Sequence, residues 1–171
     1  MSGKGFHIER LADHNRAGFC CGVDALDRYF RERVTQDVRR RVSNCFVLLG
    51  PESQVAGYYT FAAASIPLGE LPESLARRLP RYPSLPAGLI GRLAIDRLYQ
   101  RQGLGALLVV DAVARAMRAE PAIYALVVDA KDDDAAAFYS RLGFLRFCGQ
   151  RSRLFIPVAE IAKQLSGFRG R

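Results

Sequence analysis

Residues 91–108 read GRLAIDRLYQRQGLGALL, and this stretch indicates how the chain folds around it. A strand is expected over Leu89–Asp96 and a helix over Leu104–Arg118, with Gly103 and Gly105 at the turn between them. Glycines let the backbone approach an anion closely, and a helix N-terminus adds unpaired N–H groups and the positive end of its dipole. The stretch therefore predicts a strand–loop–helix unit that can cradle a pyrophosphate, although such a turn is also typical of a simple tight connection.

The spacing of this turn narrows the choice of ligand. It is not G-x-G-x-x-G, because Leu108 occupies the third glycine position, and it is not a P-loop, because no Gly-Lys-Ser/Thr follows. A dinucleotide or a nucleoside triphosphate is therefore disfavoured.

The sequence upstream of this stretch predicts a helix and several strands. A short strand is expected over Phe6–Leu11, and a helix over Ala25–Arg41, capped by Asp24 and with apolar residues four apart on one face. Cys45–Leu49 and Val55–Ile66 have the composition of strands and are joined by a tight turn, which predicts an antiparallel hairpin.

The remaining segments predict a proline loop and a second strand–helix alternation. Pro72 can begin a short helix through Arg78, and Leu79–Ala87 is expected to be a proline-stiffened loop without regular structure. The elements expected after these are a strand over Ile123–Asp129, a helix from Asp133 or Asp134 to Leu142 ended by Gly143, strands over Phe144–Phe147 and Leu154–Ile156, and a helix over Val158–Leu165. Their order predicts an α/β fold with a mixed central sheet and helices on both faces.

Length and hydropathy set the class of protein. A chain of 171 residues fits a single domain over 1–171. No apolar run approaches the ~20 residues that a membrane helix needs, and Met1–Phe6 lacks the apolar stretch of a signal peptide. A cytoplasmic protein is therefore expected.

The cysteines and histidines offer little for a metal site. They are Cys20, Cys21, Cys45 and Cys148, with His7 and His14. Because no cysteine pair has C-x-x-C spacing, neither a metal site nor a disulfide framework is expected. Cys45 and Cys148 lie beside apolar residues and are expected in the core. Nucleophilic catalysis by Cys20 or Cys21 with one of the histidines remains an alternative.

Two motifs resemble those of the GCN5-related N-acetyltransferases (GNAT). Gln100-x-x-Gly103-x-Gly105 is similar to the Q/R-x-x-G-x-G/A signature, whose backbone amides hold the pyrophosphate of acetyl-CoA in that family. Residues 135–144, AAAFYSRLGF, are similar to the family's A-x-x-h-Y-x-x-x-G-F helix (h apolar), whose tyrosine lies near the thioester sulfur. The resemblance implies that Tyr139 is the catalytic residue and protonates the departing thiolate. Asp132 stands where many members have asparagine.

The resemblance also implies the acetyl-CoA contacts and the kind of sheet. The implied contacts are Leu93, Ala94, Ile95, Gln100, Arg101, Gln102, Gly103, Leu104, Gly105, Ala106, Asp132 and Phe138. The expected fold is GNAT-like, with a mostly antiparallel central sheet. Acetyl-CoA is the expected acetyl donor, and no metal is expected.

Over Ile8–Leu165, the chain also resembles a narrower group within this family. Cys21–Asp27, the basic run Asp37–Arg41, the proline loop and Gly91–Ile95 together resemble the GNAT toxins of bacterial type II toxin–antitoxin modules. This implies an enzyme that acetylates the amino group of aminoacyl-tRNA and so inhibits translation. It also implies a ribbon-helix-helix antitoxin and a homodimer that does not itself read DNA. The alternatives are a GNAT acting on a small amine or a protein N-terminus, and a non-catalytic module that docks nucleic acid or an antitoxin.

The net charge of +8 is carried almost wholly by arginine, because only Lys4, Lys131 and Lys163 are lysines among the 25 basic residues. Base composition alone can produce this bias, but arginine also pairs phosphate oxygens bidentately. The basic residues gather in 28–41, 77–101 and 141–171, whereas 102–140 is net acidic. This segregation favours a polyanionic partner, which the resemblance implies to be the tRNA acceptor stem. The residues expected to contact it are Arg77, Arg78, Arg81, Arg92, Arg39, Arg40 and Arg41.

Overall fold

The structure, a computed structural model, describes residues 5–161 and 163. Within this part, seven strands form a sheet in the order β1-β2-β3-β4-β5-β7-β6. Their bounds are β1 His7–Arg10, β2 Asn44–Leu49, β3 Val55–Pro67, β4 Ser84–Ile95, β5 Ala125–Asp129, β6 Leu145–Arg146 and β7 Arg153–Pro157. The pairs β1–β2, β2–β3, β5–β7 and β6–β7 are antiparallel. The sheet is thus mostly antiparallel, as predicted.

The chain divides into two compact units. Unit 1 comprises Met1–Ala62 and Ile90–Ala112, and unit 2 comprises Ala63–Leu89 and Val113–Arg171. The helices are α1 Asp24–Glu32, α2 Val34–Arg39, α3 Glu73–Ala76, α4 Leu104–Arg118 and α5 Asp133–Arg141, with 3-10 turns η1 Leu68–Glu70 and η2 Arg97–Tyr99. Residues 158–161 are also helical, whereas 162, 164 and 165 of the helix predicted over Val158–Leu165 lie outside the described residues.

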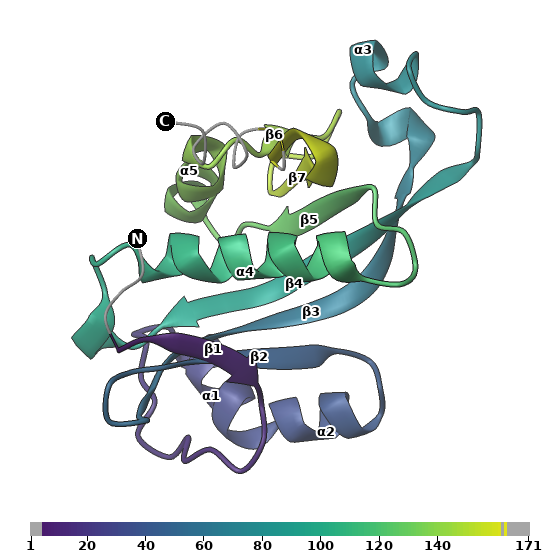
Figure 1. The fold of residues 1–171 in the computed structure, drawn as a ribbon. Coiled ribbons are helices and arrows are strands. Elements are labelled where there is room, and N and C mark those ends of the chain that lie inside the picture. Colours follow the sequence, from purple (N-terminus) through teal and green to yellow (C-terminus); the bar gives the residue numbers. More distant parts are fainter. Residues whose placement is uncertain (1–4, 162, 164–171) are drawn as a thin grey trace. The chain divides into compact units, whose positions relative to one another are not determined.

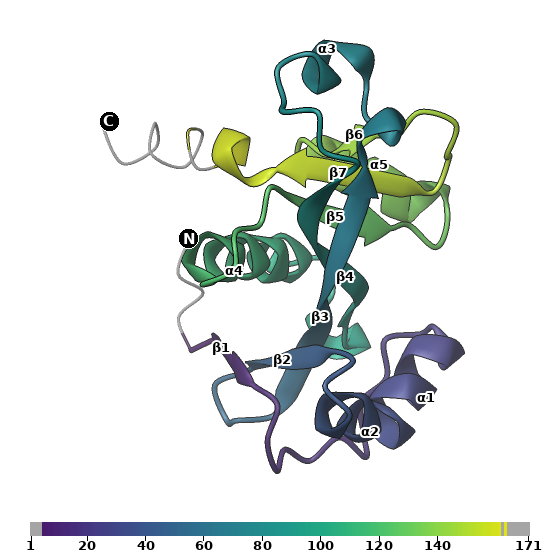
Figure 2. The ribbon, with the colours of Figure 1, turned by 90° about the vertical axis from the view of Figure 1, so that its right-hand side faces the viewer.

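Unit 1 has helices on both faces of its strands. Figures 1 and 2 show α1 and α2 on one side of β2 and β3, and the first turns of α4 on the other side. On the first side, Phe30 stacks on Tyr58 with ring centroids 4.1 Å apart, and Phe19 meets both rings edge-on. Full burial of one such aromatic side chain contributes about 1.5–3 kcal/mol. The other face is closed by Leu48, which is fully buried, and by Tyr59, whose hydroxyl donates to Asp111 of α4 at 2.6 Å.

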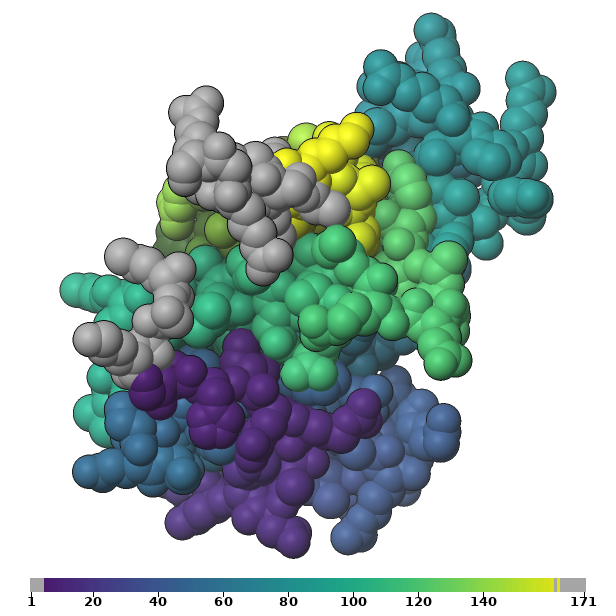
Figure 3. Space-filling view, in the orientation of Figure 1, coloured from purple at the N-terminus to yellow at the C-terminus, as the bar shows by residue number. Residues whose placement is uncertain are grey.

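The edge strand of unit 1 is β1, which pairs with β2 alone. Its side chains are mostly exposed, and its segment lies at the surface, in purple (Figure 3). The strand predicted over Phe6–Leu11 is therefore confirmed as an edge strand whose exposed charged side chains, such as Glu9 and Arg10, discourage pairing with another chain.

The single helix predicted over Ala25–Arg41 is wrong, because the structure has two helices, α1 and α2, that break at Arg33 (φ −122°, ψ −27°). In a continuous helix the carbonyl of Phe30 would accept the N–H of Val34. Here the guanidinium of Arg16 donates a hydrogen bond to that carbonyl at 2.6 Å and another to the hydroxyl of Thr35 at 2.9 Å. A side chain from the preceding loop thus competes with the helical hydrogen bond.

The helix cap predicted at Asp24 is also wrong. The N-cap residue is Val23, and no side chain caps the helix. Asp24 lies inside the first turn, where its carboxylate pairs with Arg28 at 3.0 Å.

Unit 2 is built around β5 and β7. Val127 and Phe155 are paired residues in these strands, and the ring of Phe155 lies 4.7 Å from that of Phe147. The remaining buried side chains of this core are Ile66, Leu71, Leu85, Ala87 and Ala125. Asp129, at the end of β5, accepts two hydrogen bonds from the guanidinium of Arg153, at 2.9 and 3.2 Å.

Two further predictions in unit 2 are wrong. Leu79–Ala87 is not all loop, because β4 begins at Ser84 and includes Pro86. A proline lacks only the N–H, and the carbonyl of Pro86 still accepts the N–H of Tyr124 at 2.9 Å. Cys148, predicted in the core, is exposed in the loop after β6, whereas Cys45 is buried as predicted.

Among the helices of the described residues, none combines the length and apolarity needed to cross a bilayer. Several local predictions are confirmed: α4 has the predicted bounds, α5 begins at Asp133, and Gly143 after it has a φ of +102°. These elements carry the residues of the candidate site.

Gly57 in β3 provides a test of the packing in unit 1. A Cβ there would lie 2.7 Å from Cδ1 of Ile95 and 2.9 Å from the carbonyl oxygen of Ala94. Because a backbone atom cannot move aside cheaply, Gly57→Ala should lower the free energy of unfolding by about 1–3 kcal/mol. Urea denaturation measures this change. Gly18→Ala is the matched control, since a Cβ there has nothing within 4 Å; equal stability of the two variants would contradict the packing described.

Candidate active site

The loop before α4 has a backbone shape that exposes its amides. Arg101 and Gly103 both have positive φ, 65° and 76°, and a Cβ on Gly103 would have nothing within 4 Å. Leu107 donates to the carbonyl of Gly103, and the N–H groups of the helical residues before it have no preceding turn to bond. These amides belong to Leu104, Gly105 and Ala106. The open space beside Gly103 and the free amides fit an anionic group such as a pyrophosphate.

The strand that enters this loop also belongs to unit 1. Ala94 is buried, and the flanking Leu93 and Ile95 are half-buried. The carboxylate of Asp96, the N-cap of η2, then accepts the N–H of Leu98 within η2 and the N–H of Cys20, each at 3.0 Å. The sequence-predicted residues of strand and loop, from Leu93 to Ala106, are therefore brought together in one unit.

Tyr139 lies in unit 2, on α5, and is 7% exposed. Its ring makes edge-on contacts with Phe138 and Phe144, with centroids 5.1 and 5.4 Å away. Burial raises the pKa of the Tyr139 phenol to about 12. The hydroxyl therefore stays protonated at neutral pH, which is the form that can donate a proton or a hydrogen bond.

Asp132 is the N-cap of the helix that carries Tyr139. Its Oδ1 accepts the N–H of Ala135 at 2.8 Å, and its Oδ2 pairs with the ammonium of Lys131 at 2.9 Å. The hydrogen bond from Lys131, followed by that from Ala135, lowers the pKa of the Asp132 carboxyl. The side chain thus caps the start of α5, a function that asparagine at this position could also perform.

Arginines and a tyrosine line a hollow of about 510 Å³ in unit 1. The guanidinium of Arg92 lies 3.5 Å above the ring of Tyr29, and the hydroxyl of Tyr29 donates to Asp37 at 2.8 Å. Arg33 and Arg40 lie on the wall of the same hollow. Glu32, Gln36 and Asp37 complete its lining.

The other predicted arginines are exposed and lie elsewhere. Arg39 ends α2, and Arg41 follows it with a φ of 58°. In unit 2, Arg77, Arg78 and Arg81 lie on and after α3, where Arg77 pairs with Glu73 at 2.7 Å. The predicted basic residues are therefore distributed over two units, and Arg40 and Arg92 share the hollow.

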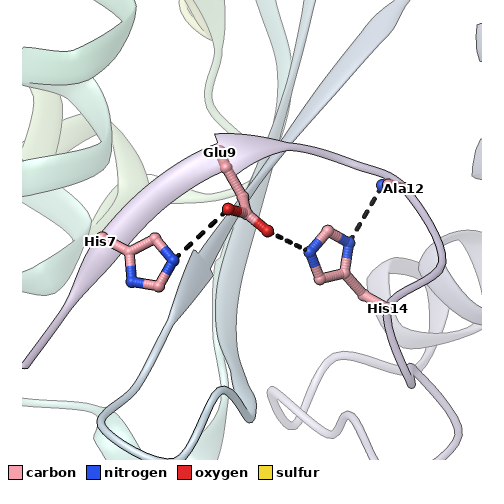
Figure 4. Close-up of polar contacts among 4 residues, drawn as sticks. All are labelled: His7, Glu9, Ala12 and His14. Atoms are coloured by element: carbon pink, nitrogen blue, oxygen red, sulfur yellow. Dashed lines mark hydrogen bonds and ion pairs between the residues drawn. The ribbon is translucent and has the colours of Figure 1, made fainter.

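Both histidines bind one carboxylate (Figure 4). Glu9 lies between His7, at 3.4 Å, and His14, at 2.7 Å. Nδ1 of His14 accepts the N–H of Ala12 at 3.0 Å, so its Nε2 is assigned the hydrogen that faces Glu9. Within residues 5–161 and 163, no group of three His, Cys, Asp or Glu is placed to hold a metal ion.

The arrangement around Cys21 does not favour cysteine–histidine catalysis. Burial, followed by the interaction with Asp27, raises the pKa of the Cys21 thiol to about 11. A nucleophilic cysteine needs a lowered pKa, because the thiolate is the reactive form.

Comparison with known proteins decides the family. The model of the FR47-like protein family matches residues 73–153. A tRNA-acetylating toxin of Mycobacterium tuberculosis is 35% identical over 128 residues, which cover 74% of this chain and 75% of that toxin. The chain belongs to the GNAT toxin family. A protein of Sinorhizobium fredii named "Probable toxin TacT" is 29% identical over 160 residues, covering 86% of this chain and 87% of that protein.

Solved structures of the family have the same fold. A tyrosine-to-phenylalanine mutant of KacT matches with a TM-score of 0.85 and 31% identity, over 94% of this chain and 99% of that one. AtaT complexed with acetyl-methionyl-tRNAfMet matches with a TM-score of 0.85 and 32% identity, over the same shares of the two chains. The predicted family, fold class and acetyltransferase activity are thereby confirmed.

Sequence reasoning missed part of the arginine hollow, namely Tyr29, Arg33 and Asp37. The signal was present, because these three residues recur every four positions in the predicted helix and so share one face. Only the fold, however, brings Arg92 of β4 over the ring of Tyr29.

The cap of α5 gives a pH-dependent prediction. Asp132→Ala should lower the melting temperature at neutral pH. Asp132→Asn should lower it much less, because an amide oxygen can still accept the N–H of Ala135. The pKa of Asp132 is lowered on folding, so its contribution is present above the unfolded value of about 3.9 and is lost as the pH falls through the folded value. Thermal denaturation from pH 7 to pH 3 should show the gap between wild type and Asp132→Ala closing. A gap that does not change with pH would contradict this role of the carboxylate.

Proposed function

We propose that this chain is the toxin of a type II toxin–antitoxin system that transfers an acetyl group from acetyl-CoA to the amino group of aminoacyl-tRNA and so inhibits translation. The observation that carries the proposal is the match over nearly the whole chain to AtaT complexed with acetyl-methionyl-tRNAfMet. The relative named as a tRNA-acetylating toxin supports the same substrate.

The donor site is assigned to the β4–α4 stretch. The backbone amides from Gln102 to Ala106 hold the pyrophosphate of acetyl-CoA, and the open space beside Gly103 gives it room. The backbone of Leu93, Ala94 and Ile95 offers hydrogen bonds to the pantetheine arm. Arg101, Asp132 and Phe138 are proposed as further contacts. In support, related structures include AtaT with its antitoxin AtaR bound with acetyl-CoA.

The chemistry needs a neutral amine and a proton for the leaving thiolate. An α-amino group has a pKa of about 7.7–8.0, so a sizeable fraction is unprotonated at neutral pH and no strong base is required. The amine nitrogen attacks the thioester carbonyl, the C–S bond breaks, and the thiolate takes a proton from the hydroxyl of Tyr139. General acid catalysis of this kind contributes ~10²–10⁴-fold, and positioning of the two substrates supplies much of the rest.

The acceptor tRNA is bound by arginines. Arg92 and Arg40 share the hollow on α1 and α2, and Arg39 and Arg41 flank it in sequence. Stacking on Tyr29 holds the plane of the Arg92 guanidinium, while its N–H groups at the edge can pair with phosphate oxygens. Arg77, Arg78 and Arg81 are proposed as a second set of contacts in unit 2.

We also propose the assembly and location of the protein. The chain works as a single GNAT domain over 1–171, forms a homodimer and binds a ribbon-helix-helix antitoxin. Structures of AtaT with the C-terminus of AtaR and of a KacTA–DNA complex support a dedicated antitoxin. The cytoplasm is the proposed location, because aminoacyl-tRNA is used there.

Tyr139→Phe tests the proposed chemistry. Mass spectrometry of aminoacyl-tRNA incubated with acetyl-CoA should show an acetylated amino group with the wild type. The variant, which loses only the donating hydroxyl, should form product at least ~10²-fold more slowly. Calorimetry should show unchanged acetyl-CoA binding. Tyr124→Phe removes another half-buried phenol of unit 2 and should keep full activity.

Full activity of Tyr139→Phe would remove Tyr139 from the mechanism. Acetylated polyamine without acetylated aminoacyl-tRNA would replace the proposed substrate with a small amine.

Arg92→Ala tests the tRNA contact. It should raise the KM for aminoacyl-tRNA several-fold and reduce the slope of log affinity against log salt by about one, because one phosphate contact is lost. Arg92→Lys keeps the charge but not the planar stack on Tyr29. Its KM for aminoacyl-tRNA should therefore lie between those of the wild type and Arg92→Ala. Arg118→Ala, outside the three basic segments, is the charge-matched control. An unchanged salt slope for Arg92→Ala would contradict the assignment.

A further inference from the structure

The backbone of Cys20 and Cys21 is hydrogen-bonded at all four of its polar groups. The N–H of Cys20 donates to Asp96 at 3.0 Å, and its carbonyl accepts the N–H of Arg97 at 2.8 Å. The N–H of Cys21 donates to Asp27 of α1 at 2.7 Å, and its carbonyl accepts Nε2 of Gln100 at 2.8 Å. Three of the four partners belong to the stretch that forms the pyrophosphate loop, and the fourth belongs to α1.

This dipeptide leads directly into α1. Gly22 follows with a φ of +97°, and α1 begins at Asp24. Asp27 is 4% exposed; burial raises its pKa, but hydrogen bonds from Cys21, Gly22 and Cys20 outweigh this and lower it overall. The carboxylate is therefore ionised and holds the dipeptide against the first turn of α1 at neutral pH.

The amide of Gln100 is fully used as a donor. Its Nε2 has two hydrogens, and it donates to the carbonyl of Cys21 at 2.8 Å and to the carbonyl of Ile95 at 2.9 Å. The remaining polar atom is Oε1. It can only accept a hydrogen bond, so it cannot bond to a phosphate oxygen, which is also an acceptor. In this geometry the side chain cannot bind the pyrophosphate, although it stands at the first position of the loop motif.

We infer that Gln100 is a positioning residue that ties the acetyl-CoA loop to the segment entering α1, and that it acts on both substrates through the backbone of Cys21. The inference rests on the proposed function for its tRNA arm only. One hydrogen bond of the pair fixes the end of β4 at Ile95. The other fixes Cys21, shortly before α1 begins at Asp24 and leads to Tyr29 at the arginine hollow. The amide of Gln100 thus links the loop before α4, which binds the donor, to helix α1, which faces the acceptor.

Gln100→Met tests this role, because methionine has nearly the same length and cannot donate. In the absence of acetyl-CoA, the backbone amides of residues 20–27 should exchange hydrogen about tenfold faster, measured by mass spectrometry of the full chain. Acetyl-CoA affinity by calorimetry should fall about tenfold, corresponding to two lost hydrogen bonds. The KM for both substrates should rise while kcat stays within about twofold, because the hydroxyl of Tyr139 is unchanged.

Two further variants make the result decisive. Gln100→Arg restores N–H donors for both carbonyls and should return the exchange of residues 20–27 to the wild-type rate. Gln150→Met makes the same chemical change in a loop of unit 2 and should leave exchange and affinity unchanged.

Faster exchange at residues 20–27 in Gln100→Met alone supports the inference. Weaker acetyl-CoA binding with unchanged exchange there would overturn it and show a direct contact of the side chain with the donor. Unchanged binding and exchange would also overturn it. The exchange and calorimetry arms need no acceptor, so they remain valid if aminoacyl-tRNA is not the substrate, which the mass spectrometry of Tyr139→Phe and wild type decides separately.

Discussion

The amides at the start of α4 can bind an anion only if the loop before them holds a left-handed backbone. Gly103 adopts this conformation freely, but Arg101, with a φ of 65°, does so at a cost of about 1–2 kcal/mol. Hydrogen bonds on the two sides of η2 offset that cost: Asp96 before it accepts two backbone N–H groups, and Gln100 after it donates to two carbonyls. These bonds restrain the segment on both sides of η2 without any ligand, and such a restraint reduces the entropy lost on binding.

The same logic applies to the arginine hollow, where one side chain determines where a helix ends. Arg16 donates to the carbonyl of Phe30, the helix breaks at Arg33, and α2 starts at Val34. Asp37 of α2 still meets the hydroxyl of Tyr29, whose pKa is raised by burial and then by this bond. The phenol stays neutral, and the negative face of its ring quadrupole attracts the Arg92 guanidinium that lies on it.

Sequence reasoning succeeded where the determinants are local. The bounds of α4 follow from the glycines before it and from its apolar period, and Gly143 marks the end of α5. It failed where a distant group intervenes. The break at Arg33 depends on Arg16 from the preceding loop, and the strand at Pro86 depends on Tyr124, whose N–H uses the carbonyl that proline retains. The motif identified Gln100, but not that its amide serves Cys21, which is 79 residues away in the chain.

The arginine guanidinium groups are not equally available to bind an anion, so the number of arginines alone does not measure anion binding. Arg16 and Arg31 donate to backbone carbonyls that would otherwise lack a partner, so releasing them to a phosphate would be costly. Arg28 and Arg77 pair with exposed carboxylates four residues away, and such pairs are worth little in water. A phosphate can therefore replace Asp24 or Glu73 at small cost. Arg92 differs from both groups, since its stack on Tyr29 engages the face of the guanidinium and leaves the N–H edge for an oxyanion. Net charge thus overstates the number of arginines that can meet a polyanion, and contact geometry rather than composition identifies Arg92 as the best prepared of them.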